Sequence, residues 1–298
     1  MPYYIRILPF IINLRLMKKI IAFLTATILF LASCQKDELI TKKIPKLDFE
    51  SSLNSIKIKE YLTYYGQSIP IGEGFVRTYV RMKDNTTPLD IGVEFSKTAI
   101  KTLPMEMDAS IDHENHNHPY NLEIPYQAKN YFSFNHISID WAMVGHGPTG
   151  VYDKPHFDIH FYLISENQQM SIINDFAYPT APSEAFTFIG PSTVPTSYFP
   201  GPFVEMMGTH WISKSAPELF SGAPFTSSFI YGTHNNEIAF IEPMVTLETL
   251  SSKKESHLPI AQPSEYIGYN KFFPTQYGIY YNNTNQSYTV ALENLIKP

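Results

Sequence analysis

Short segments that alternate apolar and polar residues, separated by turn-forming residues, recur along this chain and constrain its fold more than any other feature. Residues 75–82 alternate in this way, Asp84 and Asn85 form a turn signal, and residues 89–95 alternate again. A period of two is typical of a strand with one buried face. Abundant Tyr (20) and Phe (21), together with 23 Pro, favour strands and structured loops over long helices. The sequence therefore predicts an all-β fold, an antiparallel sandwich or barrel with a few short helices and long Pro-rich loops.

The same pattern predicts the other elements. We expect strands over residues 131–141, 156–164, 204–211, 225–231, 237–242, 275–281 and 287–292. Ser96 and Ser165 resemble N-caps of short helices, the second of which is predicted to run to about Asp175. Turn signals at 234–236 and 282–285 join the last four strands into two hairpins. Residues 178–202 are rich in proline and are predicted to wrap over the surface, because proline cannot donate to a strand ladder.

A short apolar segment near the N-terminus ends at Cys34, the only cysteine of the chain. Residues 20–33 follow two lysines and are too few to span a membrane, which takes about 20 apolar residues. The ending Leu31-Ala32-Ser33-Cys34 resembles a bacterial lipoprotein box. We therefore expect residues 1–33 to be a lipoprotein signal peptide and Cys34 to be lipidated, with an unmodified secreted protein as the alternative. Met17 is predicted to be the true start, so that residues 1–16 are a mis-assigned extension.

The remainder of the chain divides into residues 34–50, a charged tether, and residues 51–298, a single β domain. Residues 35–38 resemble the acidic tag that carries some lipoproteins to the cell surface, so we expect a lipid-anchored protein of the outer membrane, facing either outward or the periplasm. Without residues 1–33 the chain has 18 basic and 28 acidic residues, a formal charge of −10. That balance argues against nucleic acid as a partner. The expected partners are the membrane and a small ligand.

One strand carries an unusual set of polar residues. Because side chains alternate along a strand, one face of this segment is apolar, formed by Phe157, Ile159 and Phe161, and the other is formed by His156, Asp158, His160 and Tyr162. A strand of this kind is typical of a polar interior or a cleft. His156 and His160 lie roughly 13 Å apart along the strand, too far to share one ion, so at most one of them shares an ion with Asp158 unless the strand bulges.

Further ligands must therefore come from other segments. The candidates are His210 at the end of a strand, His146 in a glycine-rich loop, and Glu242, while His136 and Asp140 share a face of the preceding strand. Imidazole and carboxylate ligands suit zinc, iron or manganese. The predicted metal ligands are His156, Asp158, His160, His210, His146 and Glu242.

Other interpretations stay open at this point. The same residues could form a buried hydrogen-bond network, or an acid–base centre without metal. The loop histidines His113, His116 and His118 could bind metal loosely, and the many tyrosines could stack on sugars. No Gly-x-Ser-x-Gly elbow and no His-Glu-x-x-His motif is found in the sequence, which disfavours serine hydrolases and zincins.

The strings PHFDIHFY (155–162), GTHW (208–211) and FIEPM (240–244) resemble those of an uncharacterised bacterial family of secreted and lipid-anchored proteins. The resemblance implies one domain from about Gly74 to the end, and no particular reaction. The family's pattern has acidic residues where this chain has Gly147 and Ser213.

We therefore predict a lipid-anchored cell-envelope β module whose His/Asp-lined cleft binds a divalent metal or a small polar ligand. One alternative is a metal-dependent enzyme of cupin-like chemistry, in which three protein ligands leave a coordination position for substrate. The other is a structural envelope protein without a metal, which could assemble into homo-oligomers.

Overall fold

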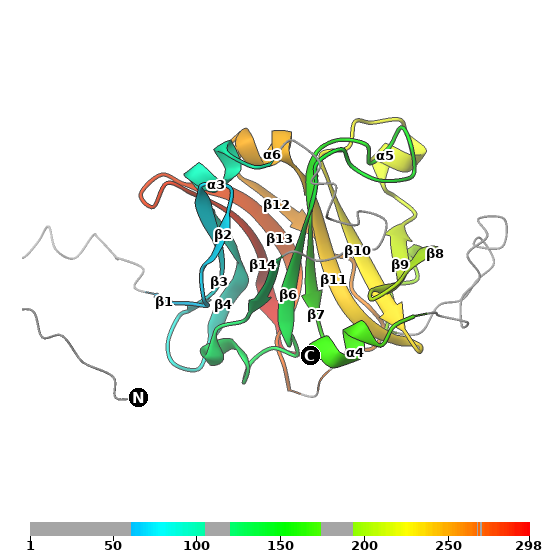
Figure 1. Ribbon diagram of the computed structural model, residues 1–298. Helices are drawn as coiled ribbons and strands as arrows, with labels where there is room; N and C mark the ends of the chain where they lie inside the picture. Colours follow the sequence, from blue (N-terminus) through cyan, green and yellow to red (C-terminus); the bar gives the residue numbers. More distant parts are fainter. Residues whose placement is uncertain (1–60, 105–119, 174–192, 267, 269) are drawn as a thin grey trace, which may run out of the picture. The chain divides into compact units, whose positions relative to one another are not determined.

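Two antiparallel sheets form the folded unit in the computed structural model (Figure 1). The structure describes residues 61–104, 120–173, 193–266, 268 and 270–298, all of which fall within one unit, Lys59–Pro298. The predicted signal peptide, Cys34, the tether and the loop histidines 113–118 lie outside the described residues. No helix of the described part is long and apolar enough to cross a membrane.

The first sheet, sheet A, is built from both ends of the unit. Its strands lie in the order β1-β3-β4-β14-β13-β12, with β2 paired to β3, so that seven strands of the described residues belong to it. Their bounds are β1 Leu62–Tyr65, β2 Ile69–Ile71, β3 Gly74–Met82, β4 Pro88–Ser96, β12 Ser256–Pro259, β13 Phe273–Asn282 and β14 Ser287–Ile296. The last strand pairs with β4 in the register Val290↔Val93, which joins segments nearly 200 residues apart.

The second sheet, sheet B, is formed by the middle of the chain. Seven strands of the described residues lie in the order β5-β6-β7-β11-β10-β9-β8. They are β5 Tyr120–Glu123, β6 His136–Ala142, β7 His156–Tyr162, β8 Tyr198–Val204, β9 Gly208–Ser213, β10 Ser227–His234 and β11 Glu237–Thr246. Short helical elements connect the strands: α3 Lys97–Lys101, η1 Tyr126–Ala128, α4 Glu166–Met170, α5 Pro217–Phe220 and α6 Leu247–Ser251.

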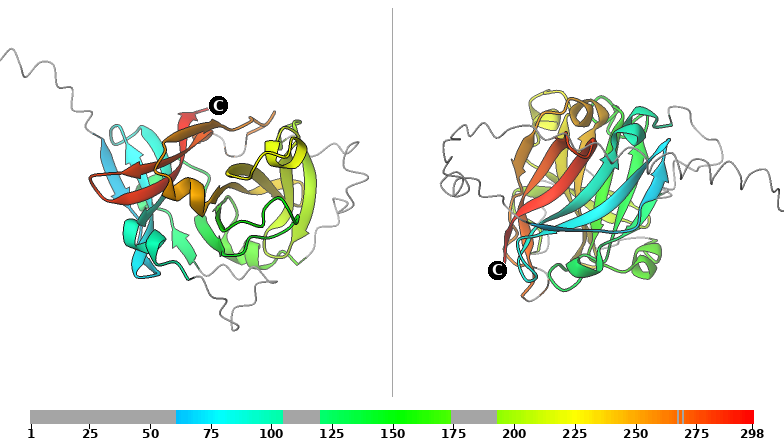
Figure 2. Two further views of the ribbon diagram at one scale, coloured as in Figure 1. Left: turned by 90° about the horizontal axis from the view of Figure 1, so that it is seen from above. Right: turned by 90° about the vertical axis from the view of Figure 1, so that its left-hand side faces the viewer.

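The main hydrophobic core lies between the two sheets. Phe157 of β7 is fully buried, and its ring centroid lies 4.7 Å from that of Phe95 of β4 and 4.7 Å from that of Trp141. Ile159 and Phe161 belong to the same core, as the alternation of β7 requires. Two packed sheets, seen from above in Figure 2 (left), confirm the all-β prediction and make the fold sandwich-like. The closed barrel, which was the other option, is not formed.

A second, smaller core lies on the opposite face of sheet B. It contains Tyr152, Phe225, Phe240 and Met244, with Val151 and Leu219 packed against it. These residues come from the loop between β6 and β7, from the region of α5, and from β11. The loop and α5 thus cover the face of sheet B that points away from sheet A (Figure 2, left). The polar side chains of β7 lie on this covered face.

Several predicted elements differ from the structure in their bounds. The strand expected over 131–141 begins only at His136, and the helix after Ser165 ends at Met170 rather than near 175. The proline-rich passage 178–202 was expected to stay out of the sheets, but Tyr198–Val204 forms β8. This strand is at the edge of sheet B, where proline costs least because one side of the strand has no ladder. The two helices that were expected, α3 and α4, have Ser96 and Ser165 as their N-caps.

Candidate metal centre

The structure gathers the six predicted ligands on the covered face of sheet B, in two groups. The first group is His146, His156 and Asp158, and the second is His160, His210 and Glu242. Within each group, one ligand atom per residue lies within 4.8 Å of the others. We call this surface the polar face of sheet B and include Asp140, which is paired with Asp158 in register.

A tight loop brings His146 over β7. Gly145 has φ 74°, and a Cβ there would lie 2.1 Å from the carbonyl oxygen of Tyr152, so only glycine fits. The backbone N–H of His146 donates to that same carbonyl at 3.1 Å. The ring of Tyr152 packs against His146 and Phe225, with centroid distances of 5.9 and 4.9 Å. The loop therefore holds the imidazole against the sheet from above.

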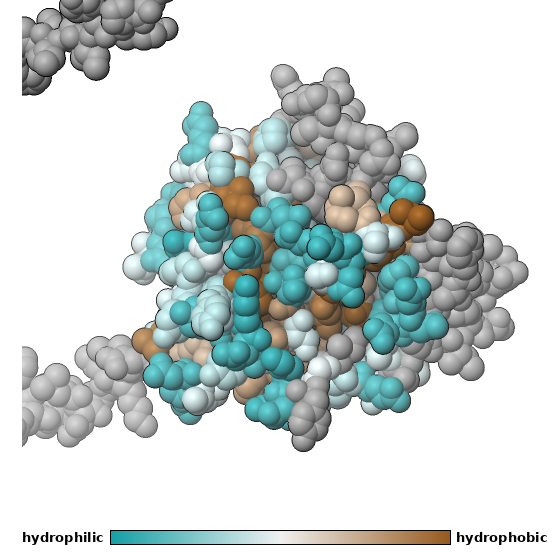
Figure 3. All heavy atoms as spheres, turned by 60° about the horizontal axis from the view of Figure 1, so that its bottom comes forward, coloured by the Kyte–Doolittle hydropathy of each residue, from teal (hydrophilic) through white to brown (hydrophobic). Residues whose placement is uncertain are grey.

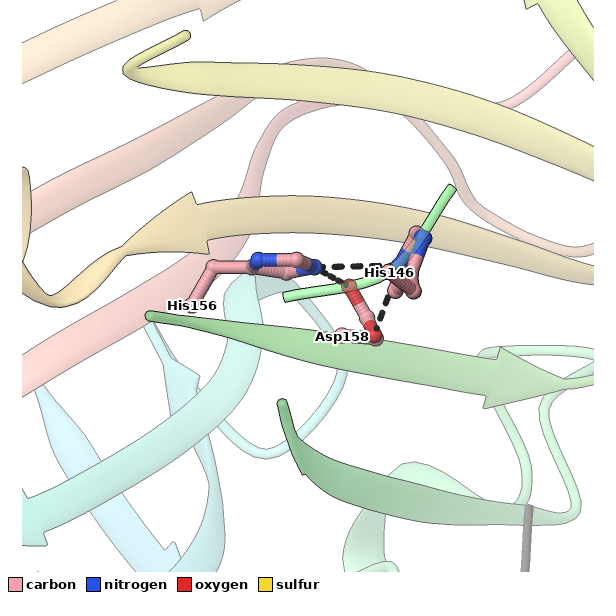
Figure 4. A group of neighbouring side chains, drawn as sticks. All are labelled: His146, His156 and Asp158. Atoms are coloured by element: carbon pink, nitrogen blue, oxygen red, sulfur yellow. Dashed lines mark hydrogen bonds and ion pairs between the residues drawn. The ribbon is translucent and has the colours of Figure 1, made fainter. Parts of the chain in front are cut away.

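Two imidazole nitrogens and the two oxygens of one carboxylate meet in the first group (Figure 4). Nε2 of His156 lies 3.0 Å from Nε2 of His146 and 3.1 Å from Oδ1 of Asp158, and Nε2 of His146 lies 3.3 Å from Oδ2 of Asp158. Two atoms bound about 2.0–2.1 Å from a metal at angles of about 90–110° are about 2.8–3.4 Å apart. The three observed separations fall within that range.

The backbone fixes which nitrogen of each imidazole carries a proton. Nδ1 of His156 lies 2.6 Å from the carbonyl oxygen of Lys154, and Nδ1 of His146 lies 2.9 Å from that of Gly147. Since a carbonyl oxygen only accepts, both Nδ1 atoms must be donors. In the neutral rings, both Nε2 atoms then present lone pairs to each other. Only a proton or a cation between them makes this arrangement favourable.

The carboxylate of Asp158 stabilises a proton on His146 when no metal is bound. Burial lowers the pKa of His146, but the hydrogen bond and the charge of Asp158 outweigh it and raise the pKa to about 9. Burial by itself raises the pKa of Asp158, but the charge of His156 and the hydrogen bonds from both histidines hold it well below its usual range. His156 is fully buried, whereas about a third of the His146 side chain is exposed, so solvent reaches the group from the loop side.

The second group lies farther along β7. Nε2 of His160 lies 3.6 Å from Oε2 of Glu242, and its Nδ1 lies 3.5 Å from Oδ2 of Asp140. His210 reaches the group from β9, and its Nδ1 donates to the carbonyl oxygen of Pro202 at 3.3 Å. Burial, followed by the charges of Asp158 and Asp140, raises the pKa of Glu242 well above its usual range.

A glycine on the neighbouring strand makes room in this second group. The ring of Phe240 stands edge-on to His160 and His210, with centroid distances of 4.9 and 5.2 Å. A Cβ on Gly232 of β10 would lie 2.0 Å from Cε1 of that ring. The position of the Phe240 ring, which contacts both imidazoles, therefore requires glycine at residue 232.

His136 lies outside both groups. Its Nε2 lies 2.7 Å from Oε1 of Gln169, and its ring stacks on Tyr162 with a centroid distance of 4.8 Å. It borders an open pocket of about 640 Å³, which is also lined by Glu123, Lys271 and residues of 129–135 and 165–167. The side of the molecule seen in Figure 3 is mostly hydrophilic.

No family model, no curated protein and no solved structure matches this chain. The resemblance to an uncharacterised lipoprotein family therefore stays a prediction. The fold and the two groups of side chains provide the basis for a functional proposal.

Proposed function

We propose that the chain is a lipid-anchored protein of the bacterial cell envelope whose folded unit binds a divalent transition metal through His146, His156 and Asp158. One observation carries the metal proposal. Two histidines whose Nδ1 protons are committed to backbone carbonyls direct their Nε2 lone pairs at one point, 3.0 Å apart, beside a buried carboxylate. Two neutral imidazoles and one carboxylate form a set of ligands typical of zinc, iron or manganese.

The alternative to the metal is a shared proton. An imidazolium at His146, hydrogen-bonded to Asp158 and His156, satisfies the same atoms without any ion. Metal and proton compete for the same lone pairs, so the metal proposal predicts that binding releases protons. The purely structural interpretation predicts no binding.

The experiment is elemental mass spectrometry on the full-length protein, purified without an oligohistidine tag after exposure to zinc, manganese or iron(II). The test variant is His146→Gln. The matched control is His257→Gln, which removes a histidine that also contacts two carboxylates, Glu255 and Glu293, but on sheet A. One equivalent of metal that is present in the parent and the control and absent from His146→Gln supports the proposal. Equal metal in all three samples, or none in the parent, refutes it.

A metal-dependent enzyme is the second candidate. Three protein ligands leave at least one coordination position for water or substrate, and the partial exposure of His146 gives solvent a route to it. Hydrolytic and oxidative assays with the metal-loaded protein test this candidate once a metal has been identified.

The lipid anchor rests on the sequence alone. It predicts that mass spectrometry of the protein isolated from its native membrane finds an acylated peptide that begins at Cys34. A mature N-terminus elsewhere, or an unmodified Cys34, would contradict it.

A further inference from the structure

The second group has the same construction as the first. Each contains two histidines and one buried carboxylate, contributed in the first group by β7 and the loop before it, and in the second by β7, β11 and β9. Glu242 lies on β11 with 2% of its surface exposed, and His160 has 1%. His210 is only partly buried, so it is the member of the group with room to adjust its position.

Oxygen atoms lie near the Nδ1 atoms of both histidines in the second group. The carboxylate of Asp140 lies 3.5 Å from Nδ1 of His160, the place of the outer carboxylate in a carboxylate–histidine–metal arrangement. The Pro202 carbonyl accepts from Nδ1 of His210. The Pro202 contact favours the tautomer of His210 in which Nε2 carries the lone pair, and Nε2 of His160 lies 3.6 Å from Oε2 of Glu242.

An ion held by the first group leaves Glu242 uncompensated. Within the described residues, Oε2 of Glu242 is buried without a hydrogen bond, and its ion-pair contact is His160 at 3.6 Å. His156 and His160 are four residues apart on a regular strand, roughly 13 Å along its axis, so one ion cannot reach both. The charged form of a buried carboxyl group is strongly unfavourable without compensation, and a cation bound to Glu242 would supply that compensation.

The net charge of the polar face of sheet B also supports a second cation. Asp140, Asp158 and Glu242 carry three formal negative charges when ionised, and each of them lies within 4 Å of a histidine nitrogen. One divalent cation leaves this face with a net charge of −1, and a second one makes it positive. The face thus has both the ligands and the charge for two ions.

We infer that the polar face of sheet B holds a second divalent transition-metal ion, bound by His160, His210 and Glu242. This inference extends the proposed function, since both ions lie on one face, but each group has its own three ligands. The two groups can therefore be tested separately.

The experiment measures zinc per chain by elemental mass spectrometry, after the full-length protein has been equilibrated with excess zinc and freed of unbound ion. All samples carry His113→Ala, His116→Ala and His118→Ala, so that the loop histidines do not contribute. The variants are His146→Gln for the first group and His210→Gln for the second, both at partly exposed positions, with His257→Gln as the control. Cooperative thermal unfolding checks that each variant folds. If one does not, the isosteric Asp158→Asn or Glu242→Gln replaces it.

The inference predicts two zinc ions in the parent and the control and one in each single-group variant. One ion, lost only in His146→Gln, overturns the inference and leaves the proposed function intact. One ion, lost only in His210→Gln, overturns the assignment of the first group and the two-ion centre together. One ion lost in both variants shows a single shared site and also overturns the inference, as does the absence of zinc in the parent.

Discussion

Metal binding at the first group should be visible as a gain in stability that Asp158→Asn abolishes. Asp158 places one oxygen near each histidine, at 3.1 and 3.3 Å, so it contacts both other members of the group. An ion that binds only the folded protein stabilises it by RT ln(1 + [M]/Kd), about 2.7 kcal/mol at a free metal concentration of 100 Kd. In a domain of about 150–250 residues, 1 kcal/mol shifts the Tm by about 2–4 °C. The expected rise is therefore about 5–11 °C.

The slope of this dependence reports the number of ions. Each further tenfold rise in free zinc adds about 1.4 kcal/mol for every ion bound, or about 3–6 °C in Tm. Asparagine keeps the shape of Asp158 but loses its charge and one acceptor. Changing a ligand should cost at least as much affinity as removing a supporting group, for which the upper range is about 100-fold. A loss of about 100-fold reduces the stabilisation at the same zinc concentration to about 0.4 kcal/mol.

The assay is thermal unfolding, followed by near-UV circular dichroism, at zinc concentrations buffered over three decades. In a His210→Gln background, which removes the second group, the protein and its His257→Gln variant should shift equally, and Asp158→Asn should shift by about 1–2 °C at the zinc concentration that gives the full effect in that background. A Tm of the parent that does not depend on zinc, or an equal shift in Asp158→Asn, would refute the assignment of these ligands.

Three further predictions concern pH and packing. The pKa of His146 is raised to about 9 without metal, so the stability that its protonated form contributes is complete below about pH 6.5 and is lost as the pH rises through 9, whereas zinc affinity should increase over the same range. The free energies of unfolding of the parent and His146→Gln, measured in urea, should therefore converge at high pH. Parallel pH profiles of the two proteins would contradict this. Phe157→Ala should lower the free energy of unfolding measured in urea by about 3–5 kcal/mol, because the fully buried ring contacts Phe95 of the opposite sheet. A loss below about 1 kcal/mol would show that Phe157 is not a central residue of the core between the sheets. Gly232→Ala should lower the free energy of unfolding by about 1–3 kcal/mol, because the added Cβ displaces the ring of Phe240. Zinc titration of the variant should show that the affinity of the second group falls more than that of the first. An unchanged stability would mean that the ring moves freely.

Much of the candidate centre could be predicted because strand alternation is local. The identities of neighbouring residues along β7 are enough to place His156, Asp158 and His160 on one face and Phe157 on the other. The rough spacing of 13 Å between the two histidines also indicated that one ion could not bind both. The structure agrees with this expectation by placing them in different groups.

The membership of each group could not be predicted from local patterns. His146 joins His156 because a loop with Gly145 at positive φ folds back over the sheet. His210 joins His160 because β9, β10 and β11 follow β7 across the sheet. Both contacts depend on pairings between distant segments, and strand pairing is settled by the burial of the whole sheet rather than by any one strand.

The sequence by itself determined that the chain forms strands, which faces of them are apolar, and which residue types are available to bind a metal. Period-two alternation, turn residues and N-caps each involve only a few neighbouring residues, so they can be recognised in the sequence. The tertiary structure alone decided that the strands form a sandwich rather than a barrel, that a proline-rich edge strand completes sheet B, and that six candidate ligands divide into two groups of three. These outcomes depend on contacts such as those of β14 with β4 and of the loop before β7 with the polar face of sheet B. Such contacts form between separate segments and contribute free energy only when the whole chain is folded.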